Sequence, residues 1–267
     1  MDSIYKYKPP IIADQVEKGN SYLPFKFGID NKAYCNSGAG IKIAIIGSGT
    51  PQHKDIEANN VSEIAMNGNT DLSDQYGFST MITGIIAANS TDGVQGFAPL
   101  SEILSVKITN KNNMIDPRAL SAAILWATVR ESDIIVVPTL GNSFDDNISL
   151  AIKKANDMRV VVIGFRPLKL DKTSVTYPEM FFIKPPFKKQ SSHQNISMYS
   201  KNVLSIRTSS KPLYTTWLDN KYAYPPPYIE CLGIMSGLAA LVIPMLKTKA
   251  ERPLPTDTIK HIVSLSK

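Results

Sequence analysis

Few side chains in this 267-residue sequence could carry out acid–base or nucleophilic chemistry. The chain has three histidines, His53, His193 and His261, and two cysteines. A cysteine next to a histidine can act as a nucleophile, because the imidazole takes the thiol proton. Cys231 is therefore the sharpest candidate for a catalytic nucleophile. The competing interpretation is a small, buried, apolar side chain, and we favour it because no motif pairs Cys231 with a histidine.

Signals for bound groups are weak. The Gly-Ser-Gly at residues 47–49 follows an apolar run, as in dinucleotide-binding loops, but position 52 is Gln where a third glycine is needed. Cys35 and Cys231 cannot form a metal site alone and could make at most one disulfide. We therefore expect no cofactor and no metal.

Composition indicates one globular domain over residues 1–267. Apolar residues make up 43% and charged residues 19% of a chain with formal net charge +6. The densest basic group, Lys184, Lys188 and Lys189, lies among prolines and predicts a solvated loop, so we expect no nucleic-acid partner. The N-terminus lacks an apolar run typical of a signal peptide, and the longest apolar stretch, 233–246, is too short to span a bilayer. We expect a cytoplasmic protein that does not contact a membrane.

Apolar runs alternate with helical patterns along the chain, which predicts βαβ units around a parallel sheet. Strands are predicted at 41–46, 103–108, 133–140, 160–163 and 203–207. Helices are predicted at 79–88, 117–129, 148–157, 233–246 and from about 256. Asp116 followed by Pro117 is a typical helix start. Residues 1–40 are interpreted as an N-terminal extension, and the Pro- and Lys-rich residues 166–200 as an irregular surface excursion.

Two segments in the first half resemble a known family. Residues 38–49, Gly-Ala-Gly-Ile-Lys-Ile-Ala-Ile-Ile-Gly-Ser-Gly, and residues 74–84, Asp-Gln-Tyr-Gly-Phe-Ser-Thr-Met-Ile-Thr-Gly, are similar to the first two motifs of the subtilisin-like serine proteases, or subtilases. His-Lys-Asp-Ile at 53–56 resembles the family's His-Pro-Asp-Leu. The resemblance covers most of residues 35–163, residues 202–206 and the last helices. It implies an α/β fold of three α/β/α layers with a central, mostly parallel sheet.

The resemblance places the family's catalytic triad at residues that cannot perform its chemistry. The first motif has Gly47 in place of the aspartate, and the second has Phe78 in place of the histidine. Anchoring the small-residue helix at 237–241 on its counterpart puts Ile229 at the serine. Acyl transfer needs a hydroxyl, a base that takes its proton and a carboxylate that orients the base. The resemblance therefore implies a triad degenerate at all three positions.

Other parts of the family's site are kept unevenly. The oxyanion asparagine should follow strand 160–163, where this chain has Gly-Phe-Arg at 164–166. A calcium site like those of many subtilases would need the loop 89–94 with Asp55 and Asp92, but that loop is a residue short and a solvated turn explains it better. The substrate-binding edge keeps a similar sequence and could still bind an extended peptide through main-chain hydrogen bonds. That edge comprises Thr139, Leu140, Gly141 and Asn142.

These observations favour a pseudoenzyme without protease activity. The leading hypothesis is an inactive subtilase homologue that binds a peptide or a partner protein. It would be a regulator or accessory subunit of an active protease or a peptide-processing enzyme. Two alternatives remain: a repurposed enzyme with a non-standard site near Cys231 or His53, and a purely structural subunit whose cleft has collapsed around Phe78.

Overall fold

The computed structural model describes most of the chain. The described residues are 10, 12–14, 27, 36–57, 61–66, 68, 70–112, 114–137, 145–165, 179–184, 195–200, 202–207, 213–248 and 251–266.

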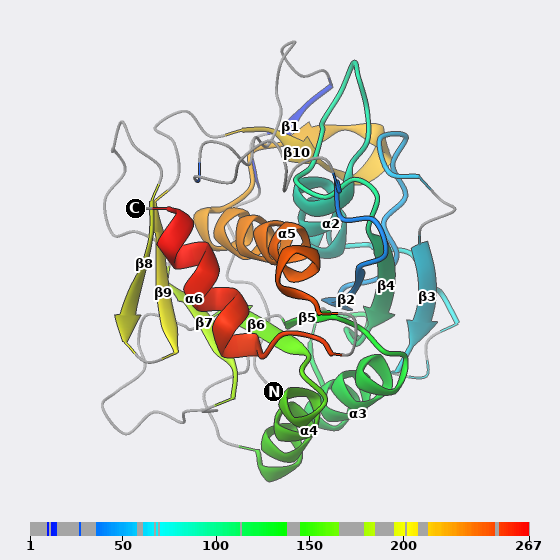
Figure 1. The fold of residues 1–267 in the computed structure, drawn as a ribbon. Helices are drawn as coiled ribbons and strands as arrows, with labels where there is room; N and C mark the ends of the chain where they lie inside the picture. Colours follow the sequence, from blue (N-terminus) through cyan, green and yellow to red (C-terminus); the bar gives the residue numbers. More distant parts are fainter. Residues whose placement is uncertain are drawn as a thin grey trace.

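An eight-stranded sheet forms the middle layer, in the order β3-β4-β2-β5-β6-β7-β9-β8 (Figure 1). Its strands are β2 (Lys42–Gly47), β3 (Val61–Ala65), β4 (Glu102–Lys107), β5 (Ile134–Val137), β6 (Val161–Phe165), β7 (Phe181–Lys184), β8 (Asn195–Ser200) and β9 (Val203–Arg207). All neighbouring pairs are parallel except β8 and β9. The expected fold class, a mostly parallel sheet between helical layers, is confirmed.

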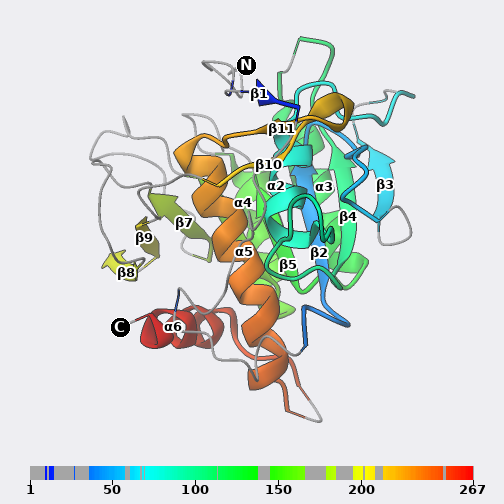
Figure 2. The same ribbon diagram turned by 90° about the horizontal axis from the view of Figure 1, so that it is seen from above.

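Helices cover both faces of this sheet (Figures 1 and 2). Helices α2 (Phe78–Ala87), α5 (Pro227–Leu246) and α6 (Pro255–Leu265) share one core cluster, while α3 (Pro117–Val129) and α4 (Asp146–Asp157) belong to the other. Strand β2 shows why two cores form: Ile43 and Ile45 point to the first cluster, and Ala44 and Ile46 to the second. A strand buried on both faces must be apolar throughout, which explains the continuous run in the sequence.

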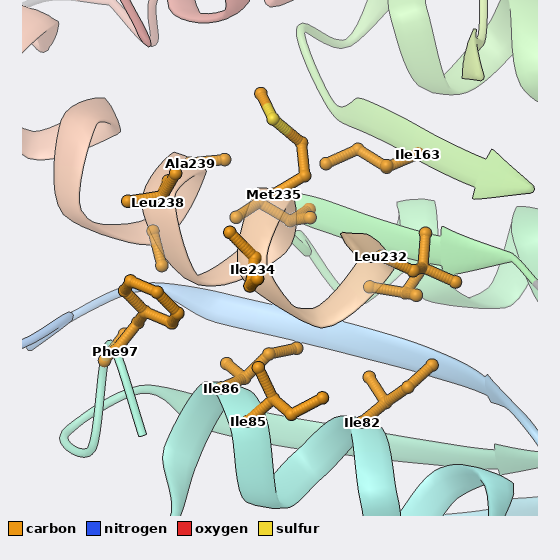
Figure 3. Close-up of a cluster of buried hydrophobic side chains, with 14 of the residues drawn as sticks. Ile82, Ile85, Ile86, Phe97, Ile163, Leu232, Ile234, Met235, Leu238 and Ala239 are labelled. Atoms are coloured by element: carbon orange, nitrogen blue, oxygen red, sulfur yellow. The ribbon is translucent and has the colours of Figure 1, made fainter. Parts of the chain in front are cut away.

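Helices α2 and α5 approach closely because α5 carries glycines where they meet. A Cβ atom on Gly233 would lie 2.8 Å from the Ile85 side chain, and one on Gly237 would lie 2.6 Å from Phe97. Figure 3 shows Ile82, Ile85 and Ile86 of α2 directed toward α5. The glycines therefore let α5 pack directly against Ile85 of α2 and against Phe97, which follows α2.

A small three-stranded sheet lies beside the start of α2. It is formed by β1 (Ile12–Ala13), β11 (Tyr222–Ala223) and β10 (Thr215–Thr216), with the short 3₁₀ turn η3 (Leu218–Asn220) between the last two. The hydroxyls of Thr215 and Thr216 donate hydrogen bonds to the carbonyls of Met81 and Thr80, at 2.9 and 2.7 Å. The hairpin is thereby attached to the first turns of α2.

Several sequence predictions need correction. Residues 166–200 are not irregular throughout, because 181–184 form β7, which pairs with β6 and β9, and 195–200 form β8. The helix expected at 233–246 begins at Pro227, since a proline is well placed at the first position of a helix. Of the strand predicted over 133–140, β5 covers Ile134–Val137, and residues 138–140 lie outside the described residues.

Helix α5 is long and apolar enough, by length and composition alone, to cross a membrane. The prediction that this apolar stretch is too short to span a bilayer took it as residues 233–246. The helix in fact extends back to Pro227. Within the protein, 83% of the apolar 18-residue segment of α5 is buried. The buried core helix of a globular protein can have the same length and apolar composition, so these two features are weak support for a membrane span.

Candidate functional site

The C-terminal end of β2 meets the N-terminal end of α2 at Gly47 and Phe78. A Cβ atom built on Gly47 would lie 2.7 Å from Cδ1 of the Phe78 ring and 2.6 Å from Oγ of Ser79. Carbon atoms do not approach this closely without displacement, because a well-packed core has no free volume to absorb the overlap. Phe78 is 1% exposed. The phenyl ring therefore occupies space that any side chain at position 47 would need.

Two serine hydroxyls complete the polar bonding around this contact. Oγ of Ser79 accepts hydrogen bonds from the backbone N–H groups of Ser48 (3.0 Å) and Gly49 (3.3 Å). The N–H of Ser79 donates in return to Oγ of Ser48 at 3.2 Å. Both serines are fully buried. Their bonds join the strand end to the helix start, and these partners include no base that could activate a hydroxyl.

Asp74 fixes the first turn of α2. One carboxylate oxygen accepts from the N–H groups of Tyr76 and Gly77, and the other accepts from the N–H and hydroxyl of Thr80. Gly77 precedes the helix in the left-handed conformation, with φ 77°. A negative charge at a helix N-terminus is favourable, so this carboxylate is a helix cap.

Ile229 lies in the first turn of α5 and is fully buried in the same core cluster as Phe78. Its neighbour Glu230 is also buried, and the Glu230 N–H donates to the carbonyl of Pro226 at 3.0 Å. An aliphatic side chain offers neither a nucleophile nor an acid. Position 229 therefore contributes packing to the helix start.

Cys231 has the environment of a structural thiol. The side chain is fully buried, and its Sγ lies 3.9 Å from the carbonyl oxygen of Ile206. Burial raises the pKa of the Cys231 thiol well above its usual value, and the charge of Glu230 raises it further. Since the thiolate is the reactive form, this geometry disfavours the Cys231 enzyme hypothesis.

An aromatic pair that the sequence did not reveal connects β6 to α5. The rings of Phe165 and Tyr228 are tilted against each other, with centroids 4.8 Å apart. Phe165 ends β6, where the resemblance would place an asparagine that donates to an oxyanion. A phenyl ring has no such donor. The signal in the sequence was Gly-Phe in place of Gly-Asn, but the pairing with Tyr228 could not be identified without the fold.

His53 has a structural role, as the sequence favoured. Its Nδ1 accepts from the N–H of Asp55 at 3.0 Å, so Nε2 carries the proton and donates to the carbonyl of Lys221 at 3.0 Å. The ring also lies edge-on to Tyr222, 5.1 Å between centroids. Burial lowers the pKa of His53 below its ordinary value of 6.5. Both ring nitrogens of the neutral imidazole are engaged by backbone groups.

Asp55 holds the loop considered as a calcium site. Its Oδ2 accepts from the N–H of Val94 at 2.8 Å, and its own carbonyl accepts from the N–H of Asn89. Burial and the Asp55 charge raise the pKa of Tyr222, whose hydroxyl hydrogen-bonds Asp55. Asp92 is exposed. Across the described part of the chain, no three His, Cys, Asp or Glu side chains gather as a metal site.

The remaining candidates are separate from this region or fall outside the described residues. His261 lies on α6 and is half-buried. The free thiol seen is that of Cys231. Positions outside the described residues are His193, Cys35 and the predicted peptide-binding residues Thr139, Leu140, Gly141 and Asn142.

Comparison with known proteins finds a family that matches the segment containing β2 and α2. The profile of the Subtilase family, peptidase S8, matches residues 38–164. Over these residues the chain is similar to the subtilases. The matched segment contains Gly47 and Phe78 and ends before Ile229. The match confirms the resemblance over this segment.

Subtilase relatives with curated names are proteases of modest similarity. The thermostable alkaline protease of Halalkalibacterium halodurans is 24% identical over 210 residues, covering 77% of this chain and 57% of that protein. The minor extracellular protease Epr of Bacillus subtilis is 30% identical over 148 residues, 54% of this chain and 22% of that protein. Subtilisin DY of Bacillus licheniformis is 24% identical over 213 residues, 77% of each. The chain thus spans less than two thirds of the length of the first two relatives.

Proposed function

We propose that this chain is a catalytically inactive subtilase homologue that binds a peptide or a partner protein. The observation that supports the proposal best is the contact between Gly47 and the Phe78 ring. In the family resemblance, these residues stand for the aspartate and the histidine of the triad. Glycine at position 47 leaves room for the ring, which lies where a carboxylate side chain would begin.

The chemistry of serine proteolysis explains why such a site would be inactive. The hydroxyl must lose its proton to a base as it attacks, and donors must stabilise the resulting oxyanion. A phenyl ring accepts no proton, and the side chain of Ile229 has no atom that can attack. In subtilisin itself, loss of the serine or histidine lowers kcat by a factor of about 2 × 10⁶.

Peptide binding does not need these catalytic groups. An extended peptide can add to the edge of a binding segment through main-chain hydrogen bonds alone. Thr139 to Asn142 follow β5 directly in the sequence and are the residues we propose for this role. The partner would be an active protease or a peptide-processing enzyme, with this chain as its regulator or accessory subunit.

A purely structural subunit is the second candidate, and the burial of the site favours it. Phe78 is 1% exposed and Ile229 is fully buried, so both side chains belong to the core and do not line an opening. The two functions differ in whether residues 139–142 capture a partner. The enzyme alternative at Cys231 has less support because of the raised thiol pKa.

Two measurements separate these functions. The first measurement is the hydrolysis of fluorescent casein and of short peptides by this chain and by active subtilisin. The second is a pull-down that compares the proteins captured by the native chain and by Leu140→Asp. Leu125→Asp, at an exposed leucine of α3, is the matched control. We expect no hydrolysis. We also expect the native chain and Leu125→Asp to capture a partner protein, and Leu140→Asp to capture none. Turnover lost on Cys231→Ala would overturn the proposal, and capture that is absent or insensitive to Leu140→Asp would favour the structural subunit.

A further inference from the structure

A depression of about 1040 Å³ lies at the β3 end of the sheet. Four segments line it: the connection after β2, strand β3, the loop before α2, and the tip of the β10–β11 hairpin. Its buried lining residues are Pro51, His53, Ile56 and Asp74, and Val61 and Leu218 are half-buried. A concave site lined by both apolar and polar groups can bind a side chain or a small ligand.

The depression is acidic although the whole chain is basic. Its exposed charged lining residues are Glu63 and Asp219 against the single ammonium of Lys54. The carboxylate of Asp74, also in the lining, is buried and caps α2. The imidazole of His53, also in the lining, is held neutral by its two backbone partners. The chain as a whole has formal net charge +6. Local charge of the opposite sign attracts a cationic group and repels an anionic one.

The hairpin tip that closes one side is held in an uncommon conformation. Asp219 and Asn220 both have φ 57°, a left-handed backbone that residues other than glycine adopt at a cost. Oδ1 of Asn220 accepts from the N–H of Lys54 at 2.7 Å, and the carbonyl of Lys221 accepts from His53. These bonds fix the tip against the connection after β2. The wall that carries Asp219 is therefore preorganised.

Strand β3 presents main-chain groups at the same place. It is the end strand of the sheet and pairs with β4 on one side, and the described chain places no strand on its other side. The N–H of Met66 donates to Lys107 in β4, and alternate residues share a direction, so the N–H and C=O groups of Glu63 and Ala65 point outward. The side chains of Val61 and Glu63 lie on the face that lines the depression.

We propose that the β3 edge and this depression bind an extended peptide segment that carries lysine or arginine. The segment adds as a further strand along Glu63 and Ala65, and alternate side chains reach over the depression toward Glu63 and Asp219. The occupant is basic because two exposed carboxylates, of Glu63 and Asp219, face one ammonium. The site contains none of Gly47, Phe78, Ile229 or residues 139–142, so it is independent of the proposed function above, and protease activity would leave it standing.

Fluorescence anisotropy with designed peptides tests this proposal on the full chain. The probe is a labelled seven-residue peptide, Ser-Val-Arg-Val-Arg-Val-Ser, at 50 mM salt. One comparison peptide has glutamate for arginine, and another has alternate backbone nitrogens methylated. We expect a Kd on the order of 10–100 μM for the arginine peptide. Both comparison peptides should bind at least tenfold more weakly, the first through charge and the second through lost main-chain donors.

Variants locate the binding. The double variant Glu63→Lys with Asp219→Lys should weaken the arginine peptide at least tenfold, while Asp157→Lys, an exposed charge at the end of α4, should leave its Kd unchanged. Hydrogen exchange of residues 61–66 should slow when the peptide is bound. Equal affinity of arginine and glutamate peptides, no binding of the arginine peptide at 1 mM, or equal effects of the two charge reversals would overturn the proposal.

Discussion

Adding one methyl group at Gly47 should destabilise the whole protein. In Gly47→Ala the new Cβ lies 2.7 Å from Phe78 Cδ1 and 2.6 Å from Ser79 Oγ, and both neighbours are buried. Ser79 cannot move freely, because its hydroxyl accepts the N–H groups of Ser48 and Gly49. Overpacking of this kind costs about 1–3 kcal/mol. For a chain of this size each kcal/mol lowers Tm by about 2–4 °C.

A double-mutant cycle with Phe78→Ala tests the cause. Phe78→Ala alone should cost about 3–5 kcal/mol, because it leaves a cavity in the core. In the double variant the alanine at position 47 extends into that cavity, so the combined loss should fall short of the sum by about 0.5–3 kcal/mol. The assay is unfolding followed by circular dichroism, in heat and in urea.

Gly164→Ala is a matched control, since Gly164 also lies near the end of a buried parallel strand. Its Cβ would meet the terminal methyl of Met180, a flexible group, so the cost should be smaller than at Gly47. A neutral Gly47→Ala, or simple additivity of its cost and that of Phe78→Ala, would show that the ring does not exclude a side chain at position 47.

Three further predictions follow from single residues. The folded-state pKa of His53 lies below 6.5, so its stabilising contribution is complete above pH 6.5 and declines as the pH falls below it. The free energy of unfolding from pH 7.5 to 5 should therefore fall more steeply in the native chain than in His53→Gln, and parallel curves would contradict this. In a Cys35→Ser variant, Cys231 should react with a thiol reagent at pH 8 on the order of 10³-fold more slowly in the folded chain than in the unfolded chain, because burial disfavours the thiolate. Equal rates in the two states would count against a structural thiol. Asp74→Ala should lower the free energy of unfolding in urea by about 1.5–3 kcal/mol. The variant of an exposed cap, Asp116→Ala, should lower it by about 1 kcal/mol. The reverse order would be inconsistent with Asp74 as the main cap of α2.

Elements with a clear local signal could be predicted from sequence, whereas the edge strand β3 and the short interior strand β7 could not. The apolar run of β2 and the Asp116-Pro117 start of α3 matched the structure because each follows from local chemistry. Strand β3 was missed, since Val-Ser-Glu-Ile-Ala is half-exposed at the sheet edge and has no clear pattern. Strand β7 was missed because Phe-Phe-Ile-Lys stands among prolines, and only pairing with β6 and β9 makes it a strand.

The candidate site shows the same division. The motifs placed Gly47 and Phe78 at the end of β2 and the start of α2, and the structure brings the two into contact. That the ring fills the space above Gly47 required coordinates, because a motif gives positions and not packing. The Phe165–Tyr228 pair and the acidic depression join segments that lie far apart in the sequence, and no local pattern predicts such contacts.

The most direct test of the account is covalent labelling of the purified chain by a fluorophosphonate, which reacts with an activated serine. Intact-mass spectrometry after prolonged incubation, together with casein hydrolysis under the same conditions, should show the unmodified mass and no turnover above the blank, while active subtilisin is labelled fully. Stoichiometric labelling of any serine, accompanied by casein hydrolysis that the label abolishes, would contradict the claim that this subtilase homologue has lost its catalytic chemistry.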